Sequence, residues 1–467
     1  MVTYFPNIIS RKAMMYYFIT LATVSVLFFN QILPFVWILF GSFEVWSFFY
    51  FSNDLTKRWQ LLRPKVFVKK LFWTALIIRL VYVIFAYFFY DAMTGRPFMF
   101  FSADEQVYYN VSKIWREQGF EPFRATLRGF GIDDVGEMCF TGFLCRLFGA
   151  YILVARIGHS LLSTVTCILI YRIAKRHFGE STARMAAIFC MLMPNLVYYC
   201  GIHLKEADMV FVTVLFVDSI DSLLTERKFD VMKVVLVLAS GFAMFTFRTV
   251  LGAVGVIALG VTLAFSKGQI GSWWKRIVLV VLVVVSLGTT SIGLRIMSEV
   301  DTAWSRRELN QEVGMEARAQ SAGGNSFARF GSRAVFAPLI FTIPFPSLIY
   351  VEGQQNQQML NGGNYVKNVL SGFVVFALVM MLLSGDWRKH ILPIALMGGY
   401  LLVIASSNFA HSERFHQPAL PFELMFAAYG ISLLTAKQAK WLDYWFLIIL
   451  VANIGWAWVK LAGRGML

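Results

Sequence analysis

The sequence is short of charged residues. Asp, Glu, Lys and Arg make up only 15% of the 467 residues, whereas hydrophobic residues make up 58% and the mean hydropathy is +0.63. Soluble domains carry roughly a quarter charged residues. The scarcity of charge therefore excludes an ordinary soluble domain and indicates a protein embedded in a membrane.

Patterns for disulfides and for cysteine-based metal sites are also missing. The five cysteines are scattered in mostly apolar stretches, without a C-x-x-C pair, and the six histidines form no cluster. These spacings exclude a disulfide framework and a cysteine zinc site. Ten-residue segments of alternating polarity are absent as well, which excludes a transmembrane β-barrel.

Negative charge is the scarcer sign, with 27 Asp and Glu against 42 Lys and Arg, for a net charge of +15. In a membrane protein such a surplus reflects topology and contact with anionic lipid. We therefore expect membrane lipid as a partner and no nucleic acid.

Apolar runs long enough to cross a bilayer as helices occur along most of the chain, because lipid offers no partner to unpaired backbone groups. They predict an all-α, polytopic transmembrane helical protein with about thirteen spans. The predicted spans are 13–29, 33–52, 71–90, 149–171, 181–199, 207–224, 231–247, 250–266, 276–295, 367–384, 391–407, 418–435 and 442–460.

The short loops predict the orientation, since Lys and Arg collect in short cytoplasmic loops. With simple alternation of the spans, every short basic cluster falls on one side, from Arg11 and Lys12 to Lys437 and Lys440. The amino terminus is then cytoplasmic. Two large loops, 91–148 and 296–366, face the outside.

The two outer loops differ in character. In the first, 104–118 and 133–148 have the spacing of amphipathic helices that lie on the membrane surface. The second is polar at first and then turns apolar, with three prolines between 338 and 346. We predict a lid followed by a re-entrant segment there. Residues 1–70 form an additional amino-terminal helical hairpin.

An acidic pair, Asp104 and Glu105, directly follows the third span, and Ser102 is placed to cap the helix that they begin. One interpretation is an ordinary helix start, where negative charge is favoured. The other is a general base that takes a proton from an acceptor hydroxyl or amine.

A family resemblance favours the second interpretation. The pattern Asp104-Glu105-x-x-Tyr108, continued through 115–120, resembles the first outer loop of GT-C glycosyltransferases, in particular protein O-mannosyltransferases and lipid A aminoarabinose transferases. Further similarities follow in order along the chain: Arg156, the turn 174–179, Pro194, Lys205-Glu206 and the segment 414–421. The chain differs from that pattern in the two spans ahead of the acidic pair and in having no soluble domain after the last span. The resemblance implies a single GT-C-like transmembrane domain over 1–467.

The resemblance also implies a reaction, the transfer of a sugar from a polyprenyl-phosphate donor to a glycan, lipid or protein acceptor. Asp104 would be the base, with Glu105 tuning it or positioning the acceptor. A phosphate that leaves at the outer surface requires cations. The candidates are Lys205, Arg248, Arg414 and Arg156, supported by Tyr108, Glu206 and His411. For Arg156 and Arg248, snorkelling from a helix end remains the alternative.

No metal is favoured. His203, His411 and His416 are suitable ligand types together with the acidic pair, but no spacing marks them as a set. We therefore expect metal-independent catalysis without a cofactor. Within the spans, Glu44 and Arg79 are predicted to pair, because an unpaired charge is strongly disfavoured in the membrane.

Three functions remain open from the sequence. The leading one is an inverting GT-C glycosyltransferase. The others are a polysaccharide polymerase or ligase that uses a lipid pyrophosphate-linked glycan, and a lipid or glycan transporter. A transporter would line a central path with charge, whereas here the candidate charges gather at one face. The acceptor pattern Asn110-Val-Ser112 would place a glycan beside the acidic pair in a eukaryotic lumen. We therefore expect a bacterial inner membrane with the site facing the periplasm or outside.

Overall fold

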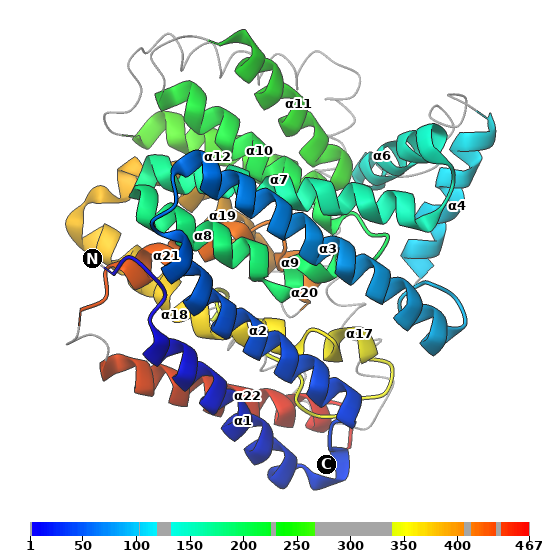
Figure 1. Ribbon diagram of the computed structural model, residues 1–467, viewed down its shortest axis with the longest axis vertical. Coiled ribbons are helices and arrows are strands. Elements are labelled where there is room, and N and C mark those ends of the chain that lie inside the picture. The colour runs from blue at the N-terminus through cyan, green and yellow to red at the C-terminus, as the bar shows by residue number, and fades with distance from the viewer. Residues whose placement is uncertain are drawn as a thin grey trace.

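The computed structural model describes residues 2–101, 103–118, 132–225, 230–266, 339–405, 412–435 and 440–466, without the side chains of 115, 132 and 133. Within these residues the protein is an all-α polytopic membrane protein with no strand. Most of the long helices run in one general direction across the molecule (Figure 1). The helices are α1 (Asn7–Leu27), η1 (Phe29–Gln31), α2 (Phe35–Trp59), α3 (Pro64–Thr94), α4 (Ala103–Gln118), α6 (Ile132–Phe148), α7 (Ile152–Phe178), α8 (Glu180–Leu192), α9 (Pro194–Tyr198), α10 (Glu206–Thr225), α11 (Val231–Phe247), α12 (Thr249–Phe265), α17 (Gln355–Gln358), α18 (Asn361–Ser384), η2 (Asp386–Lys389), α19 (Ile391–Ala405), α20 (Glu413–His416), α21 (Leu420–Ser432) and α22 (Trp441–Ala462).

The predicted all-α class is confirmed, and each predicted span inside the described residues falls on helix. Helices α2, α3, α7, α18 and α22 are long and apolar enough to cross a membrane, and α11, α12, α19 and α21 are shorter apolar helices. The predicted span 181–199 consists of α8 and α9, which are separated at Met193. The predicted span 276–295 lies outside the described residues.

The core lies where α7, α8, α10 and α21 pack together, and α18 packs against α21. Nearly every side chain of α8 and α21 is buried. The outer helices α2, α3 and α22 each bury one face and expose apolar side chains such as Phe43, Phe88 and Val451 on the other. An exposed apolar face on a membrane-length helix is suited to contact with lipid.

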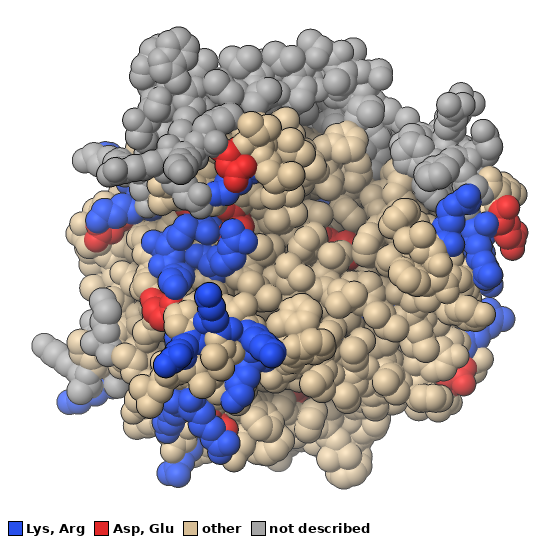
Figure 2. Space-filling model, turned by 45° about the horizontal axis from the view of Figure 1, so that its top comes forward, with Lys and Arg blue, Asp and Glu red and all other residues tan. Residues whose placement is uncertain are grey.

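The two ends of the bundle differ in charge. The basic end carries the α2–α3 connection, where Lys57, Arg58, Arg63, Lys65, Lys69 and Lys70 are all exposed. Figure 2 shows the larger gathering of lysine and arginine side chains on that side, and a smaller one beside acidic side chains at the opposite edge. The opposite end, here called the loop end, carries the α3–α4 connection and the starts of α7 and α10. This sorting of charge agrees with simple alternation of the spans.

A buried segment without regular structure lies ahead of α18, within the predicted second outer loop. Ile340, Ile343 and Phe345 are buried in the main core. The Asn368 side-chain amide donates to the carbonyls of Thr342 and Pro344. Non-helical backbone at membrane depth persists only where the protein supplies such partners. The predicted lid lies almost wholly outside the described residues, and membrane re-entry stays a prediction.

The predicted Glu44–Arg79 pair is wrong, because the two side chains face different helices. Glu44 faces α18, where Oε2 accepts from the Gly363 amide at 3.0 Å. Arg79 is fully buried and donates from Nε to the Ser163 hydroxyl, at 2.8 Å. It also donates from Nη2 to the Cys190 carbonyl at 3.2 Å.

The Cys190 carbonyl explains why an arginine is suited to the position of Arg79. In a continuous helix this carbonyl would accept from the amide four residues later, but residue 194 is proline and has no N–H. The guanidinium satisfies the freed acceptor near the carboxyl end of α8, where the helix dipole favours a cation. A backbone carbonyl freed in this way replaces the carboxylate that was predicted as the partner of Arg79.

The amino-terminal hairpin is packed into the bundle. Helix α2 lies against α18 and α8, and α1 lies against α22. At the α2–α18 contact, an added Cβ on Gly362 would come within 2.4 Å of the Gly41 carbonyl oxygen. Small residues allow this close approach of two helix backbones.

Candidate functional site

The acidic pair lies at the loop end, where α3 stops and α4 begins. Gly95 ends α3 with φ 71°, in the left-handed region that favours glycine. Asp104 and Glu105 then occupy the first turn of α4. Successive helical residues point about 100° apart. As a result Glu105 is fully buried, whereas the Asp104 side chain is 55% exposed.

Glu105 ties several segments together. Its Oε1 accepts from Arg156 Nη2 on α7 at 2.9 Å and from the His203 amide at 2.6 Å. Its Oε2 accepts from the Met99 amide at 2.8 Å. Arg156 also donates to the Pro97 carbonyl. This buried ion pair therefore fixes the start of α4 against α7 and against the α9–α10 connection.

Asp104 belongs to a second group of charges, which is partly exposed. Its Oδ2 accepts from Arg414 Nη1 at 2.8 Å. The Arg414 Nε donates to Oε1 of Glu206, the first residue of α10. Burial alone would lower the pKa of Arg414, but Glu206 and Asp104 raise it overall, so its guanidinium stays charged.

Arg248 lies on the other side of Glu206, at the junction of α11 and α12. Its Nη2 is 4.0 Å from Glu206 Oε1, and its Nη1 donates to the Tyr400 hydroxyl at 3.0 Å. The guanidinium also lies over the Phe415 ring, 4.2 Å from its centroid. The side chain is therefore held within the protein, which argues against snorkelling into lipid.

Lys205 joins the site through a residue that the sequence analysis missed. Its Nζ lies 2.6 Å from Oδ1 of Asp134, which also accepts from the Tyr108 hydroxyl at 2.7 Å. Burial would raise the pKa of Asp134, but Lys205 outweighs it and the pKa is lowered. Burial and the Asp134 charge raise the pKa of Tyr108, which keeps that hydroxyl a donor. The Asp133-Asp134 pair at the start of a predicted loop helix was the signal that could have identified Asp134.

The structure brings together at the loop end most of the side chains selected from the sequence. They are Asp104, Lys205, Glu206, Arg248 and Arg414, with Tyr108 beside them. Arg156 and Glu105 lie behind this group as a buried pair. His411 and Ser102 lie outside the described residues. The roles assigned to these side chains stay predictions.

The group is close to neutral without a substrate, because the carboxylates of Asp104, Asp134 and Glu206 face the cations of Lys205, Arg248 and Arg414. Such a site can exchange partners. A phosphate that binds the cations releases carboxylates, and a released carboxylate can accept a proton.

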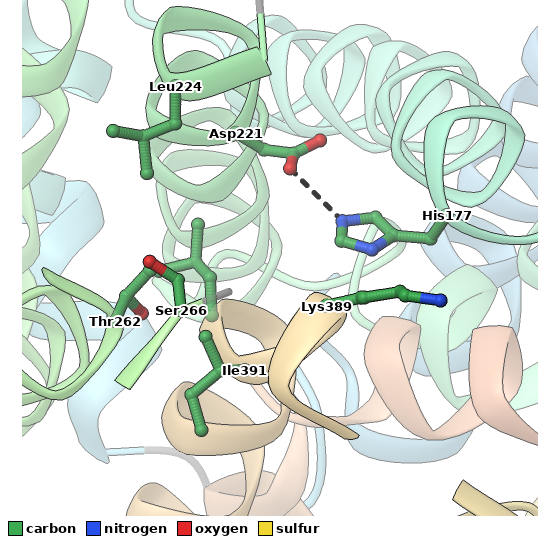
Figure 3. Close-up of a pocket in the computed structure, with 8 residues that line it drawn as sticks. His177, Asp221, Leu224, Thr262, Ser266, Lys389 and Ile391 are labelled. Carbon is green, nitrogen blue, oxygen red and sulfur yellow. Dashed lines mark ion pairs between the residues drawn. The ribbon is translucent and has the colours of Figure 1, made fainter. Parts of the chain in front are cut away.

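A pocket at the basic end has a different character (Figure 3). It is lined by His177, Asp221, Leu224, Thr262, Ser266, Lys389, Ile391 and Leu392. The His177 imidazole points towards Asp221, with Nε2 3.1 Å from Oδ1, and Arg176 also pairs with Asp221. Asp221 lies about 20 Å along α10 from the loop end. We assign this pocket no part in chemistry at Asp104.

A family model described as dolichyl-phosphate-mannose-protein mannosyltransferase matches residues 138–292. The matched stretch contains Arg156, Lys205, Glu206 and Arg248, whereas Asp104 and Arg414 lie outside it. A search of curated proteins found no significant match. The match covers about a third of the chain, and over that stretch this all-α polytopic protein is similar to a family of GT-C glycosyltransferases.

Proposed function

We propose that this membrane protein is a glycosyltransferase that moves a sugar from a polyprenyl-phosphate donor to an acceptor hydroxyl at the loop end, with inversion at the sugar carbon. The acceptor is part of a glycan, lipid or protein. Asp104 takes the hydroxyl proton, the acceptor oxygen bonds to the anomeric carbon, and the bond from that carbon to the phosphate oxygen breaks. The polyprenyl phosphate leaves with the bonding electron pair.

The observation that carries this proposal is the Asp104–Arg414–Glu206 array, which joins an exposed carboxylate to cations from distant segments. The donor phosphodiester carries one negative charge, and the departing monoester carries two. Cations already fixed at the site stabilise the charge that develops, without reorganisation during the reaction. Arg414, Arg248 and Lys205 meet this need.

Binding of the donor also prepares the base. A phosphate on Arg414 competes with Asp104 for the guanidinium, while Glu206 holds the Arg414 Nε in place. Asp104 is then free to accept a hydrogen bond from the acceptor hydroxyl. The proposed transfer uses the released Asp104 carboxylate as a base and requires no metal at that carboxylate.

Donor binding provides a test of the cationic half of the site. Arg248→Gln is expected to weaken binding of a polyprenyl-phosphate sugar roughly ten- to hundredfold, since a hydrogen bond to a charged group is worth about 1.5–3 kcal/mol. The measurement is retention of labelled donor by the purified protein in detergent. Lys12→Gln, which removes a cation paired with Asp443 at the basic end, serves as the control.

The same assay distinguishes the polymerase or ligase alternative. If the protein retains a polyprenyl-pyrophosphate glycan and not the monophosphate sugar, the proposed donor class is wrong. If Arg248→Gln and the unsubstituted protein bind the donor equally well, Arg248 does not contribute to donor binding.

The sorting of charge supports an orientation with the basic end in the cytoplasm and the loop end in the periplasm or outside a bacterial inner membrane. Arg96 and Lys65 are exposed at opposite ends. Cys139 is partly exposed, whereas the other four cysteines are buried, so Cys139→Ser provides the background. We expect Arg96→Cys to react with an impermeant thiol reagent in spheroplasts. Lys65→Cys should react only after permeabilisation, and the reverse pattern would invert the topology.

A further inference from the structure

A second group of polar side chains lies inside the bundle, away from the charges around Asp104. Glu137 of α6, His159 of α7 and Asp208 of α10 converge there, and each is no more than 1% exposed. The His159 Nε2 is 3.3 Å from Glu137 Oε1 and 3.5 Å from Asp208 Oδ2. One ligand atom from each residue lies within 4.8 Å of the others. His203 places its Nε2 3.9 Å from Glu137 Oε1.

The buried polar atoms of this cluster lack well-formed hydrogen bonds. Among the described residues, none has the geometry of a hydrogen-bond partner for either carboxylate oxygen of Glu137 or Asp208, for His159 Nε2, or for the two ring nitrogens of His203, although His159 lies at ion-pair distance from both carboxylates. Buried polar groups almost always have a partner, and a cluster of orphans needs an explanation such as an ion. Two buried carboxylates this close together require compensation, either by a cation or by a proton.

The His159 ring is oriented as a ligand would be. Its Nδ1 lies 3.3 Å from the Ile202 carbonyl oxygen. A carbonyl only accepts, so Nδ1 carries the proton, and in the neutral ring the lone pair of Nε2 faces the two carboxylates. Metal-bound histidines typically donate their other ring N–H to a carbonyl in this way. Without a cation, a lone pair directed at two carboxylates is repulsive.

The spacing is suited to a small ion. Two ligand atoms about 2.0–2.1 Å from a tetrahedral zinc ion lie about 3.3–3.4 Å apart. The distances from His159 Nε2 to Glu137 and Asp208 are 3.3 and 3.5 Å. His203 is close to Glu137 alone and does not belong to the group of atoms within 4.8 Å of one another, so its ring must move towards His159 and Asp208 to become a fourth ligand. Two imidazoles with two carboxylates suit zinc better than calcium or magnesium, which prefer oxygen ligands alone.

We propose that Glu137, His159 and Asp208 bind one zinc-class divalent ion, with the His203 ring moving in as the fourth ligand. The ion neutralises the two carboxylates and fastens α6, which belongs to the first large loop, to α7 and α10. Four protein ligands and complete burial are typical of a structural site. The site also adjoins the acidic pair, because the His203 amide donates to Glu105. The ion therefore stiffens the backbone behind Asp104 without touching the reacting atoms.

Metal content tests this site independently of transfer activity. The full chain, purified in detergent without a histidine tag, is expected to hold about one zinc per molecule by mass spectrometry. Asp208→Asn and His159→Asn should reduce that content severalfold. His390→Asn is the matched control, since His390 is a buried histidine at the basic end. An unchanged zinc content in Asp208→Asn and His159→Asn would overturn the proposal.

Thermal stability gives a second test of the site. It compares the metal-free and zinc-loaded protein, so it does not require any variant to retain metal during purification. After chelation, added Zn²⁺ should raise the unfolding temperature of the unsubstituted protein and leave that of Asp208→Asn unchanged. In the metal-free state Asp208→Asn should unfold at a higher temperature, because it removes one of two repelling carboxylates. Loss of stability in Asp208→Asn without metal, with no response to Zn²⁺, would indicate a protonated His159 held between two carboxylates and would refute the metal site.

Discussion

Replacing Asp104 with asparagine is expected to lower the rate of sugar transfer about 10²–10⁴-fold, the usual contribution of a positioned general base. Asparagine keeps the size of the side chain and still accepts a hydrogen bond from Arg414, but it cannot take a proton at neutral pH. Donor binding should be retained or slightly tightened, because a carboxylate that competes with phosphate for Arg414 is lost. The measurements are single-turnover transfer and donor retention on the same preparation.

Asp443→Asn is the matched control. Asp443 is 52% exposed and pairs with Lys12 at 2.6 Å, much as the 55% exposed Asp104 pairs with Arg414 at 2.8 Å, but it lies at the basic end. Its substitution should leave transfer unchanged. Full turnover by Asp104→Asn would remove Asp104 as the base. If Asp134→Asn loses transfer instead, the base is Asp134, the other partly exposed carboxylate of the site.

The gathering of charge at one end could be predicted because it depends only on the alternation of spans. Lys205, Arg248 and Arg414 are far apart in sequence, yet each follows an odd number of predicted crossings and so belongs to the side of Asp104. The prediction that these cations share one end required only the number of spans ahead of each residue, and not the direction of any side chain. The structure adds that Glu206 is the residue between Arg414 and Arg248.

The depth of individual side chains could not be predicted in the same way. Asp104 and Glu105 are adjacent in sequence, but a helix turns them in different directions, and only packing decides which one is buried. Arg156 was grouped with the phosphate-binding cations because its position along α7 is at the right level. Arg156 lies on the inward-facing side of α7. Its Nη2 donates hydrogen bonds to Glu105 and to the Pro97 carbonyl there.

The proposed metal ligands illustrate a further limit. Glu137, His159, His203 and Asp208 come from three helices and a connection, and their spacings in sequence match no metal motif. His203 was considered as a ligand with Asp104 and Glu105, which lie on the same side of the membrane. Only the packing of α6 against α7 and α11 places Glu137 within reach of the histidines instead.

Breaking the buried Glu105–Arg156 pair is expected to have the largest effect on stability. Glu105→Gln should lower the free energy of unfolding by about 3–5 kcal/mol, because the Arg156 guanidinium, which is fully buried, loses its counter-charge. The glutamine also presents an NH₂ group to a position where three N–H donors converge. The measurements are thermal unfolding in detergent and limited proteolysis of the α3–α4 connection.

A double-mutant cycle separates the energy of the Glu105–Arg156 ion pair from the other effects of changing either residue. Arg156→Met removes the buried charge, so Glu105→Gln together with Arg156→Met should cost clearly less than the sum of the single changes. Transfer by the folded fraction of Glu105→Gln should fall in turnover more than in donor affinity, because Asp104 loses its fixed position while Arg414 and Arg248 remain. Additive stability costs, or an unchanged turnover, would show that Glu105 does not hold the start of α4 in place.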